Sequence, residues 1–238
     1  MTELGTALAT PDAKARYVRR LFDTIADRYD LITVLLSFGL DRRWKVRLAD
    51  LAAIQAGARV LDLACGTGDI AFDLARRGAH ATGLDLTHRM LALARRKPDA
   101  SLTSRFIQGD MMALPFPAAS FDVVTTGYGI RNVPRIEPAI AEIARVLRPG
   151  GLFLSLDFDR PANAMMRGVY LGYLNVVGGA LGWILHRDPD TYRYIPASLA
   201  RYPGAGQVSA MLEAAGFHDA RVVPVLGGLM AINVARRC

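Results

Sequence analysis

The sequence predicts an α/β protein with a mostly parallel β-sheet, and three features support this fold class. From Gly57 onward, short apolar segments such as RVLDLA (59–64) alternate with amphipathic segments of helical length. This alternation is typical of a parallel sheet covered by helices on both faces. A glycine loop, CGTGD (65–69), joins the first apolar segment to the first amphipathic one. Two β-rich segments, at 219–227 and 229–235, predict a closing antiparallel hairpin.

The remaining elements of this domain follow from hydrophobic periodicity and from Gly and Pro at segment ends. We expect strands at HATGLDL (80–86), SRFIQGD (104–110), FDVVTTGYG (121–129) and LFLSLDF (152–158). We expect helices at DIAFDLARRG (69–78), HRMLALARRK (88–97), EPAIAEIARVL (137–147) and GQVSAMLEAAG (206–216). The turn RPGG (148–151) is expected to close the third of these helices.

The chain divides into a cap, a domain and an insertion. Residues 1–56 predict an N-terminal helical cap, with a disordered start, one helix from Pro11 to Asp30 and a second over 41–54. Residues 57–238 form the α/β domain. Within it, the segment 159–203 interrupts the strand–helix rhythm, and we interpret it as a helical insertion that covers the substrate. Insertions at the carboxyl ends of parallel strands commonly carry substrate-binding groups.

The composition limits the function classes. The 238 residues include 29 Lys and Arg against 22 Asp and Glu, for a net charge of +7. The basic residues are scattered, without long blocks or interleaved aromatic residues, so we expect no nucleic-acid binding, whereas attraction to anionic lipid stays open. Two cysteines and the lack of a signal-peptide pattern indicate a reducing, cytoplasmic location. The four histidines have no ligand spacing, so we expect no metal.

The glycine loop predicts a nucleotide-type ligand. Gly66 and Gly68 let the backbone turn sharply and approach a ligand closely. The pattern Gly66-x-Gly68-x-x-Ala71 also satisfies the dinucleotide fingerprint. An NAD-binding enzyme or a non-catalytic cofactor-binding protein is therefore an alternative.

Three carboxylates at successive strand ends favour S-adenosylmethionine as the cofactor. Asp62 stands beside the glycine loop, where it suits a cationic amino group and would repel a pyrophosphate. Asp85, at the end of the next strand, can accept both ribose hydroxyls, and Asp110 follows where an adenine amino group can be recognised. An amine, a ribose and an adenine without phosphates describe S-adenosylmethionine. The alternative for Asp62 and Asp110 is structural, as caps of nearby backbone amides.

The chain resembles a known family along nearly its whole length. The segments that carry the resemblance are FDTIADRYD (22–30), SFGLDRRWK (37–45), LDLACGTGD (61–69), ALPFP (113–117), GIRNV (129–133), VLRPGG (146–151) and DTYRYIPASLARYP (190–203). They are similar to those of the ubiquinone/menaquinone biosynthesis C-methyltransferases, which methylate a ring carbon of a polyprenylated quinol. The resemblance implies a Rossmann-like class I methyltransferase fold with a seven-stranded sheet, and S-adenosylmethionine as the cofactor.

The same resemblance implies cofactor contacts at Thr67, Asp85, Asp110 and Met111. Together with the residues argued above and their neighbours, the expected cofactor set is Asp62, Gly66, Thr67, Gly68, Asp85, Leu86, Asp110, Met111 and Gly127. The chain departs from the family pattern at Thr33, where Asn is usual, and at Gly127, where Ser is common. These departures leave the identity of the ring substrate open.

Methylation of a quinol ring carbon requires a polarised ring hydroxyl and a group that removes the ring proton. Arg131 and Asn132 follow a strand end, and our hypothesis is that Arg131 stabilises the phenolate while Asn132 orients it. The further candidates for hydrogen bonding or proton relay are Tyr29, Tyr128, Tyr192 and Asp157. The alternatives are a structural ion pair for Arg131 and a packing role for the tyrosines.

The expected reaction transfers a methyl group to demethylmenaquinol or to a 2-methoxy-6-polyprenyl-benzoquinol, and the sequence does not choose between them. An alternative acceptor is another hydrophobic molecule, such as a phospholipid amine or a secondary metabolite. We expect peripheral contact with the inner face of the cell membrane. A homodimer or a complex with other quinone-biosynthesis enzymes stays open.

The segment 169–185, VYLGYLNVVGGALGWIL, contains no charged residue. As a helix it would be about 25 Å long, which is short for a hydrocarbon core of about 30 Å. It predicts a transmembrane helix, a buried core helix or a cover that shelters the prenyl tail and touches the membrane surface, and we favour the cover. A stripe of small residues would let this helix lie close to another backbone: Gly168, Gly172, Asn175, Gly179 and Gly182.

Overall fold

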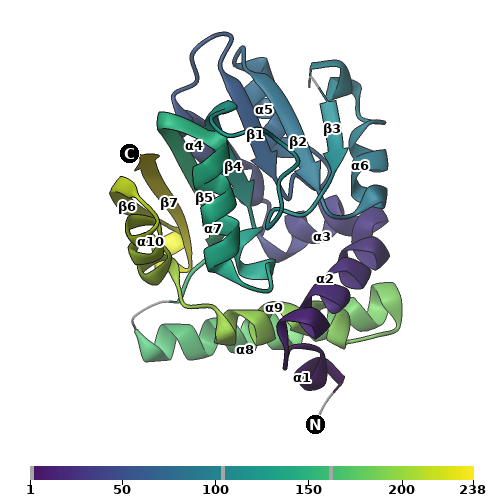
Figure 1. Cartoon of the computed structure of the whole chain (residues 1–238). Coiled ribbons are helices and arrows are strands. Elements are labelled where there is room, and N and C mark those ends of the chain that lie inside the picture. Colours follow the sequence, from purple (N-terminus) through teal and green to yellow (C-terminus); the bar gives the residue numbers. More distant parts are fainter. Residues whose placement is uncertain (1–2, 103–104, 161–162) are drawn as a thin grey trace.

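The centre of the computed structural model is a seven-stranded sheet in the order β3-β2-β1-β4-β5-β7-β6 (Figure 1). The structure describes residues 3–102, 105–160 and 163–238. The strands are β1 (Arg59–Leu63), β2 (His80–Asp85), β3 (Arg105–Gln108), β4 (Phe121–Gly127), β5 (Leu147–Phe158), β6 (Phe217–Val225) and β7 (Met230–Arg237). β1 to β5 pair in parallel, and β7 pairs antiparallel with β5 and β6. The expected fold class is confirmed.

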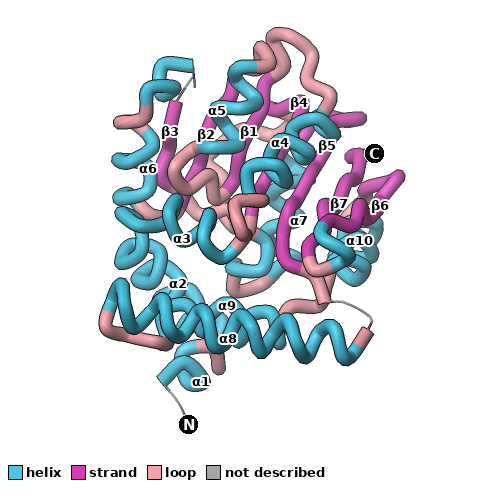
Figure 2. Tube along the Cα trace, turned by 180° about the vertical axis from the view of Figure 1, so that it is seen from behind, coloured by secondary structure: helices cyan, strands magenta, loops and turns pink. Residues whose placement is uncertain are grey.

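Helices cover both faces of the sheet and one of its ends. They are α1 (Glu3–Ala7), α2 (Pro11–Ile25), α3 (Tyr29–Leu36), α4 (Asp41–Ala52), α5 (Asp69–Arg76), α6 (His88–Ala94), α7 (Ile136–Val146), α8 (Ala164–His186), α9 (Asp190–Arg201) and α10 (Ala205–Ala214). Short 3-10 turns add η1 (Ala26–Arg28), η2 (Pro98–Leu102), η3 (Ile130–Asn132) and η4 (Leu226–Gly228). Figures 1 and 2 show α8 and α9 side by side across the carboxyl ends of the parallel strands.

The core forms because each strand alternates its side chains between the two faces. On β1, Leu61 and Leu63 belong to the cluster that includes α7 and α10, whereas Val60 belongs to the cluster that includes α4 and α5. All three side chains are fully buried, and burying each of them stabilises the fold by about 1.5–3 kcal/mol. Helix α4 of the expected cap packs on the sheet, in the same cluster as Val60. The division of cap from domain at residue 56 stays a prediction.

The N-terminal helices differ from expectation in two places. Residues Glu3–Ala7 form α1, so the expected disordered start is wrong there, because Leu4 and Leu8 are buried against the cap. The expected helix from Pro11 to Asp30 is two helices separated by η1. Its start is as expected, since Thr10 Oγ1 accepts the backbone N–H of Ala13 at 3.2 Å.

β5 begins at Leu147, so the RPGG turn lies inside a strand rather than only closing α7, because Leu147 already pairs with Phe121 of β4. β3 is described from Arg105, and Ser104, where we expected it to begin, lies outside the described residues.

Candidate active site

A pocket lies at the carboxyl ends of β1, β2 and β4, where the sheet order runs outward in both directions from β1 and β4. Open α/β sheets bind ligands at such a switch point. Six of the nine expected cofactor residues line the pocket: Gly66, Asp85, Leu86, Asp110, Met111 and Gly127. We call it the cofactor pocket. Most of the expected set therefore lies at one site.

Asp85 fixes the glycine loop to the end of β2. Its two carboxylate oxygens accept the backbone N–H groups of Gly66 and Thr87, each at 2.8 Å. Burial raises the pKa of Asp85, while these two hydrogen bonds oppose the shift. Each oxygen has a second lone pair, so the carboxylate can still accept hydroxyl groups from a ligand.

Asp62 is buried at the end of β1 beside a small pocket that Thr67 and Gly127 also line. Its Oδ1 accepts the hydroxyl of Thr125 at 2.8 Å; the backbone N–H of Ala71 lies near the carboxylate, but Oδ2 makes no hydrogen bond of ordinary geometry in the described part of the chain. Burial raises the pKa of Asp62 to about 7, and the Thr125 hydrogen bond opposes this shift. An unpartnered buried acceptor fits a cationic amino group.

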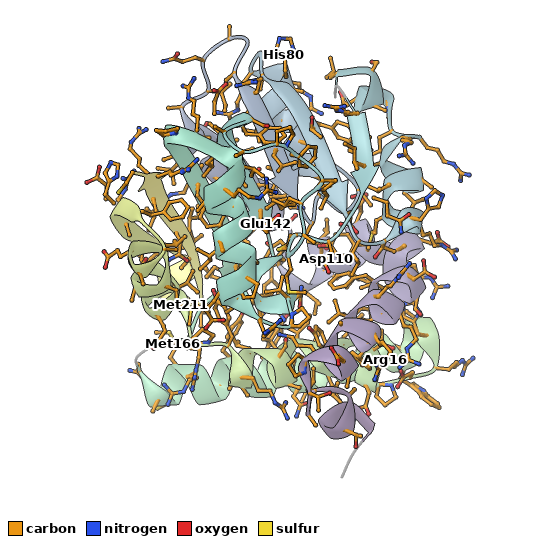
Figure 3. All side chains as sticks on the ribbon, viewed as in Figure 1. Arg16, His80, Asp110, Glu142, Met166 and Met211 are labelled. Atoms are coloured by element: carbon orange, nitrogen blue, oxygen red, sulfur yellow. The ribbon has the colours of Figure 1, made fainter. Side chains whose placement is uncertain are left out.

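Asp110 and Gly68 both stabilise the local backbone, a role that was expected only as an alternative for Asp110. Asp110 lies near the lower end of the sheet, far from His80 at the opposite end (Figure 3). Its Oδ1 accepts the backbone N–H of Met112 at 2.8 Å, as the capping alternative predicts, although Asp110 also lines the cofactor pocket. Gly68 lines neither of the two pockets at the loop; its φ is +89°, and a Cβ there would lie 2.8 Å from the Phe72 ring.

Thr67 belongs to a network of charged side chains that sequence reasoning missed. Its hydroxyl donates to Asp30 at 2.6 Å, and Lys97 Nζ lies 3.0 Å from the same oxygen. Lys97 also pairs with Asp30 and Asp69, each at 2.8 Å. The network therefore ties α3 of the cap to the glycine loop and to the chain after α6.

Lys45 extends this network into the core of the cap. It pairs with Asp41 at 2.6 Å and with Asp69 at 2.9 Å, and Asp41 accepts the hydroxyl of Tyr128 at 2.6 Å. Burial disfavours the ammonium, but Asp41 and Asp69 outweigh it and raise the pKa of Lys45. A signal was present in the sequence, because Asp41 and Lys45 fall on the helix face that Trp44 and Leu48 make apolar.

A cavity of about 720 Å³ adjoins the cofactor pocket. Apolar side chains of α2, α3, α8 and α9 make up most of its wall, and we call it the apolar cavity. Four residues line both spaces: Phe22, Tyr29, Tyr128 and Asn132. A ligand in the apolar cavity would therefore meet a cofactor at these four side chains.

Asn132 is held in place at this junction. Its Nδ2 donates to the carbonyl of Tyr128 at 2.6 Å, and its Oδ1 accepts the hydroxyl of Tyr194 at 2.8 Å. One N–H of the amide stays available for a ligand, because the NH₂ group has two donors. Tyr194 comes from α9, so the insertion positions Asn132, which follows the carboxyl end of β4.

Arg131 forms the ion pair that the structural alternative predicts. Its Nε donates to Asp157 at 3.2 Å, its backbone N–H donates to the same carboxylate at 3.0 Å, and Nη1 donates to Ser198. The guanidinium also lines the apolar cavity over the ring of Phe158, and Nη2 has no hydrogen-bond partner among the described residues. Asp157 lines neither the apolar cavity nor the cofactor pocket, so it binds Arg131 from the side that faces away from them.

Tyr29 and Tyr192 occupy different parts of the apolar cavity. Tyr29 packs near the glycine loop, 3.8 Å from where a Cβ on Gly66 would lie. Tyr192 lines the apolar cavity but not the cofactor pocket, and its hydroxyl lies 2.8 Å from His186 Nε2. Burial raises the pKa of both tyrosines, so both stay neutral near pH 7.

Among the described residues, no group of three or more His, Cys, Asp or Glu side chains is arranged to hold a metal ion. The site instead combines a carboxylate-lined cofactor pocket, a large apolar cavity and polar side chains where they meet.

A family model for the ubiE/COQ5 methyltransferases matches residues 10–237. The chain belongs to this family. As a family member it is a C-methyltransferase, with S-adenosylmethionine as its cofactor. The unpartnered Oδ2 of Asp62 and the remaining acceptor capacity of Asp85 fit the amino group and ribose of that cofactor.

Individual relatives agree with the family assignment. The chain is 44% identical over 220 residues to demethylmenaquinone methyltransferase of Thermus thermophilus, covering 91% of this chain and 100% of the relative. It is 39% identical to the ubiquinone/menaquinone biosynthesis C-methyltransferase UbiE of Dinoroseobacter shibae, covering 98% and 95%. A SAM-dependent methyltransferase of Thermotoga maritima matches the fold with a TM-score of 0.66 and 17% identity, covering 93% of this chain and 100% of that one.

Proposed function

We propose that this methyltransferase acts on a ring carbon of a polyprenylated quinol. The observation that carries the proposal is the apolar cavity of about 720 Å³ that meets the cofactor pocket at Tyr29 and Asn132. A prenyl tail needs a long apolar enclosure, and a ring must lie close to the methyl group. The relatives named as quinone methyltransferases support the same substrate class.

In this proposal Arg131 and Asn132 act on the oxygen of the quinol ring. The bound cofactor supplies an electrophilic methyl group on a sulfonium. Arg131 Nη2 stabilises the phenolate that forms when the ring hydroxyl loses its proton to water, and the free amide N–H of Asn132 fixes its orientation. Once the new C–C bond has formed, the methylated ring carbon also loses its proton to water, which restores the aromatic ring. Asp157 keeps the guanidinium in place. Tyr29 and Tyr192 serve as neutral hydrogen-bonding groups, because their raised pKa values keep both phenols protonated near pH 7.

The cofactor residues have separate roles in the proposal. Asp62 binds the amino group, Asp85 accepts the ribose hydroxyls, and Asp110 with Met111 and Leu86 holds the adenine. Gly66 lets the loop approach the ligand, and Gly127 lets the end of β4 pack closely on α5, since a Cβ there would lie 2.7 Å from Ile70. Thr67 and Gly68 hold the loop itself.

The test is turnover with purified protein, the methyl donor, and short-chain demethylmenaquinol and demethylbenzoquinol, with products identified by mass spectrometry. Methylation of either ring is the expected result, and the preferred ring decides between the two quinols. Arg131→Lys is expected to lower kcat by about a hundredfold with little change in cofactor affinity, in line with the loss of one oxyanion donor. Unchanged turnover in Arg131→Lys would remove Arg131 from the mechanism. If neither quinol were methylated, the proposed substrate class would be wrong.

We also propose that the mouth of the apolar cavity rests on a membrane. Five exposed apolar side chains belong to its wall: Phe38, Met165, Met166, Val169 and Leu226. By length and composition α8 could cross a membrane. Its glycine-rich face packs on α9, however, and other residues of α8 line the cavity, so we favour a helix that lies on the lipid surface. The net charge of +7 complements anionic headgroups.

Vesicle cosedimentation tests this contact. Val176 and Ile184 are about 70% exposed on α8 and lie outside the cavity wall (73% and 69%). Val176→Ser/Ile184→Ser is expected to weaken binding to phosphatidylglycerol vesicles by roughly tenfold, since each loses buried apolar area in the bilayer. Leu102→Ser/Val222→Ser, on η2 and β6, is the matched control and is expected to bind normally. Equal binding by all three proteins would contradict the proposed contact. A homodimer or a pathway complex stays a prediction.

A further inference from the structure

A separate pocket is lined by residues of α2, η3, α7, α9 and α10 and of the loops beside them. Its volume is about 310 Å³, and four of its lining residues are basic: Lys14, Arg131, Arg135 and Arg201. Glu137 is the one acidic residue among the described residues that line it. We call it the basic pocket. It shares Arg131 with the apolar cavity, and it shares Val133 and Pro134 with the cofactor pocket.

Most of the positive charge in this pocket is not neutralised by the protein. Arg135 and Arg201 are exposed, and neither has a carboxylate within 4.0 Å among the described residues. The guanidinium of Arg201 only approaches the carbonyl of Ala197 at 3.5 Å. The Arg131 charge is already paired with Asp157. The pocket is therefore a concentration of cations around a space that a small anion could enter.

Lys14 is held at the pocket wall by the backbone. Its Nζ donates to the carbonyls of Arg131 at 2.9 Å and Val133 at 2.6 Å, which leaves one of its three N–H donors available. Burial, followed by the positive charge of Arg131, lowers the pKa of Lys14 to about 8. Such a shift is typical of a buried ammonium that lies beside another positive charge.

The start of α7 adds to the same positive field. Arg135 is the N-cap residue, and its side chain makes no capping hydrogen bond. The first backbone N–H groups of a helix and the positive end of the helix dipole attract anions. An arginine at the N-cap position is repelled by that positive end unless an anion lies between the guanidinium and the helix. Glu137 in the first turn offsets part of this field and Pro138 has no backbone N–H, so the helix start contributes less to the pocket than the basic side chains do.

We propose that the basic pocket binds a phosphate group, carried either by a soluble phosphate ester or by an anionic lipid headgroup. Phosphate oxygens match the forked donors of arginine and the N–H groups of a helix start. The proposal does not rest on the quinol substrate, because phosphate binding is measured without quinol and without methyl transfer.

The experiment is calorimetric titration of the full chain with inorganic phosphate and with glycerol phosphate. Arg135→Gln/Arg201→Gln removes two exposed charges at the pocket, and Arg59→Gln/Arg221→Gln removes two exposed charges elsewhere. The pocket variant is expected to bind phosphate roughly tenfold more weakly, because two charge-assisted contacts are lost, and the control is expected to bind normally. Unchanged S-adenosylmethionine affinity in both variants verifies that they fold.

Phosphatidylglycerol and phosphatidylcholine vesicles distinguish the two sources. Phosphate binding without any effect of the pocket variant on vesicles supports a soluble ester. Weaker vesicle binding by the pocket variant alone, with competition by free phosphate, supports a lipid headgroup. Absence of saturable phosphate binding in the millimolar range would overturn the proposal. Equal losses in the two double variants would do the same, because they would mean that only net charge matters.

Discussion

The hydroxyl of Thr67 donates a hydrogen bond to the carboxylate of Asp30 at 2.6 Å, and this contact joins the glycine loop to the cap. Lys97 binds the same two residues, so the contact is part of a charged network rather than an isolated pair. Because Thr67 follows Gly66 in the loop, the contact places α3 beside the backbone that a cofactor approaches. We therefore expect cofactor binding to depend on the contact between α3 and the loop.

Asp30→Ala is expected to raise the dissociation constant for S-adenosylmethionine by about tenfold, since it frees the Thr67 hydroxyl and removes one partner of Lys97. Stability should change little, because Asp30 is about half exposed (48%) and exposed ion pairs contribute up to about 1 kcal/mol. Calorimetry measures the affinity. Asp27→Ala is the matched control, since Asp27 also lies in the cap but pairs with Arg89 on the surface. Equal affinities in the two variants would refute the coupling.

Cofactor affinity is expected to depend on pH through Asp62. The free carboxyl has a pKa of about 7, raised by burial, and the cationic amine binds its ionised form. Below pH 7 protonation competes with binding, so affinity should fall by about tenfold per pH unit between pH 6.5 and 5.5. Because the folded pKa is raised, this group makes the cofactor-free protein more stable as pH falls from 7 toward 4.

Calorimetric titrations from pH 5.5 to 7.5 measure the affinity, and Asp62→Asn serves as the control. The variant is expected to bind more weakly but with an affinity that no longer depends on pH in this range. A pH-independent wild-type affinity would show that Asp62 does not bind the amine.

Lys45→Met is expected to destabilise the protein by about 3–5 kcal/mol, because Asp41 is left buried without its ammonium and Asp69 loses one of two partners. For a chain of this size that loss lowers Tm by roughly 10 °C. Thermal unfolding measures the shift. Arg47→Met removes an exposed charge from the same helix, and its Tm should stay within about 2 °C of the wild type. Similar shifts in both variants would contradict a structural role for the network.

The sheet was predictable because its signals are local. Alternation and glycine placement identified β1 to β5 and the hairpin, and the carboxyl ends of parallel strands necessarily brought Asp62, Asp85 and Asp110 to one edge. The junction of the two spaces was not predictable in this way. The Tyr194–Asn132 hydrogen bond joins residues 62 positions apart, and the Arg131–Ser198 contact joins residues 67 apart. Only the packing of α9 against η3 decides these contacts.

The predicted stripe of small residues on α8 is correct for two of its four glycines. Gly179 and Gly182 face α9, together with Gly178, which was not part of the stripe. Gly168 and Gly172 face open space, where a Cβ would meet nothing within 4 Å. The spacing of the small residues identified the side of α8 that packs on α9, apart from Gly178, which it left out. It did not indicate how far along α8 the contact with α9 extends.

This difference makes two glycines of one helix respond in opposite directions to the same substitution. A Cβ on Gly182 would lie 2.4 Å from the carbonyl oxygen of Asp188, so Gly182→Ala must shift the α8–α9 connection and is expected to destabilise the protein by about 1–3 kcal/mol. Gly172→Ala adds a methyl group in open space and should stabilise α8 by about 0.5–1 kcal/mol, because alanine is the better helix former. Chemical unfolding of both variants measures these changes. If both variants lost stability equally, α8 would not pack on α9 as described, and its glycines would face another partner.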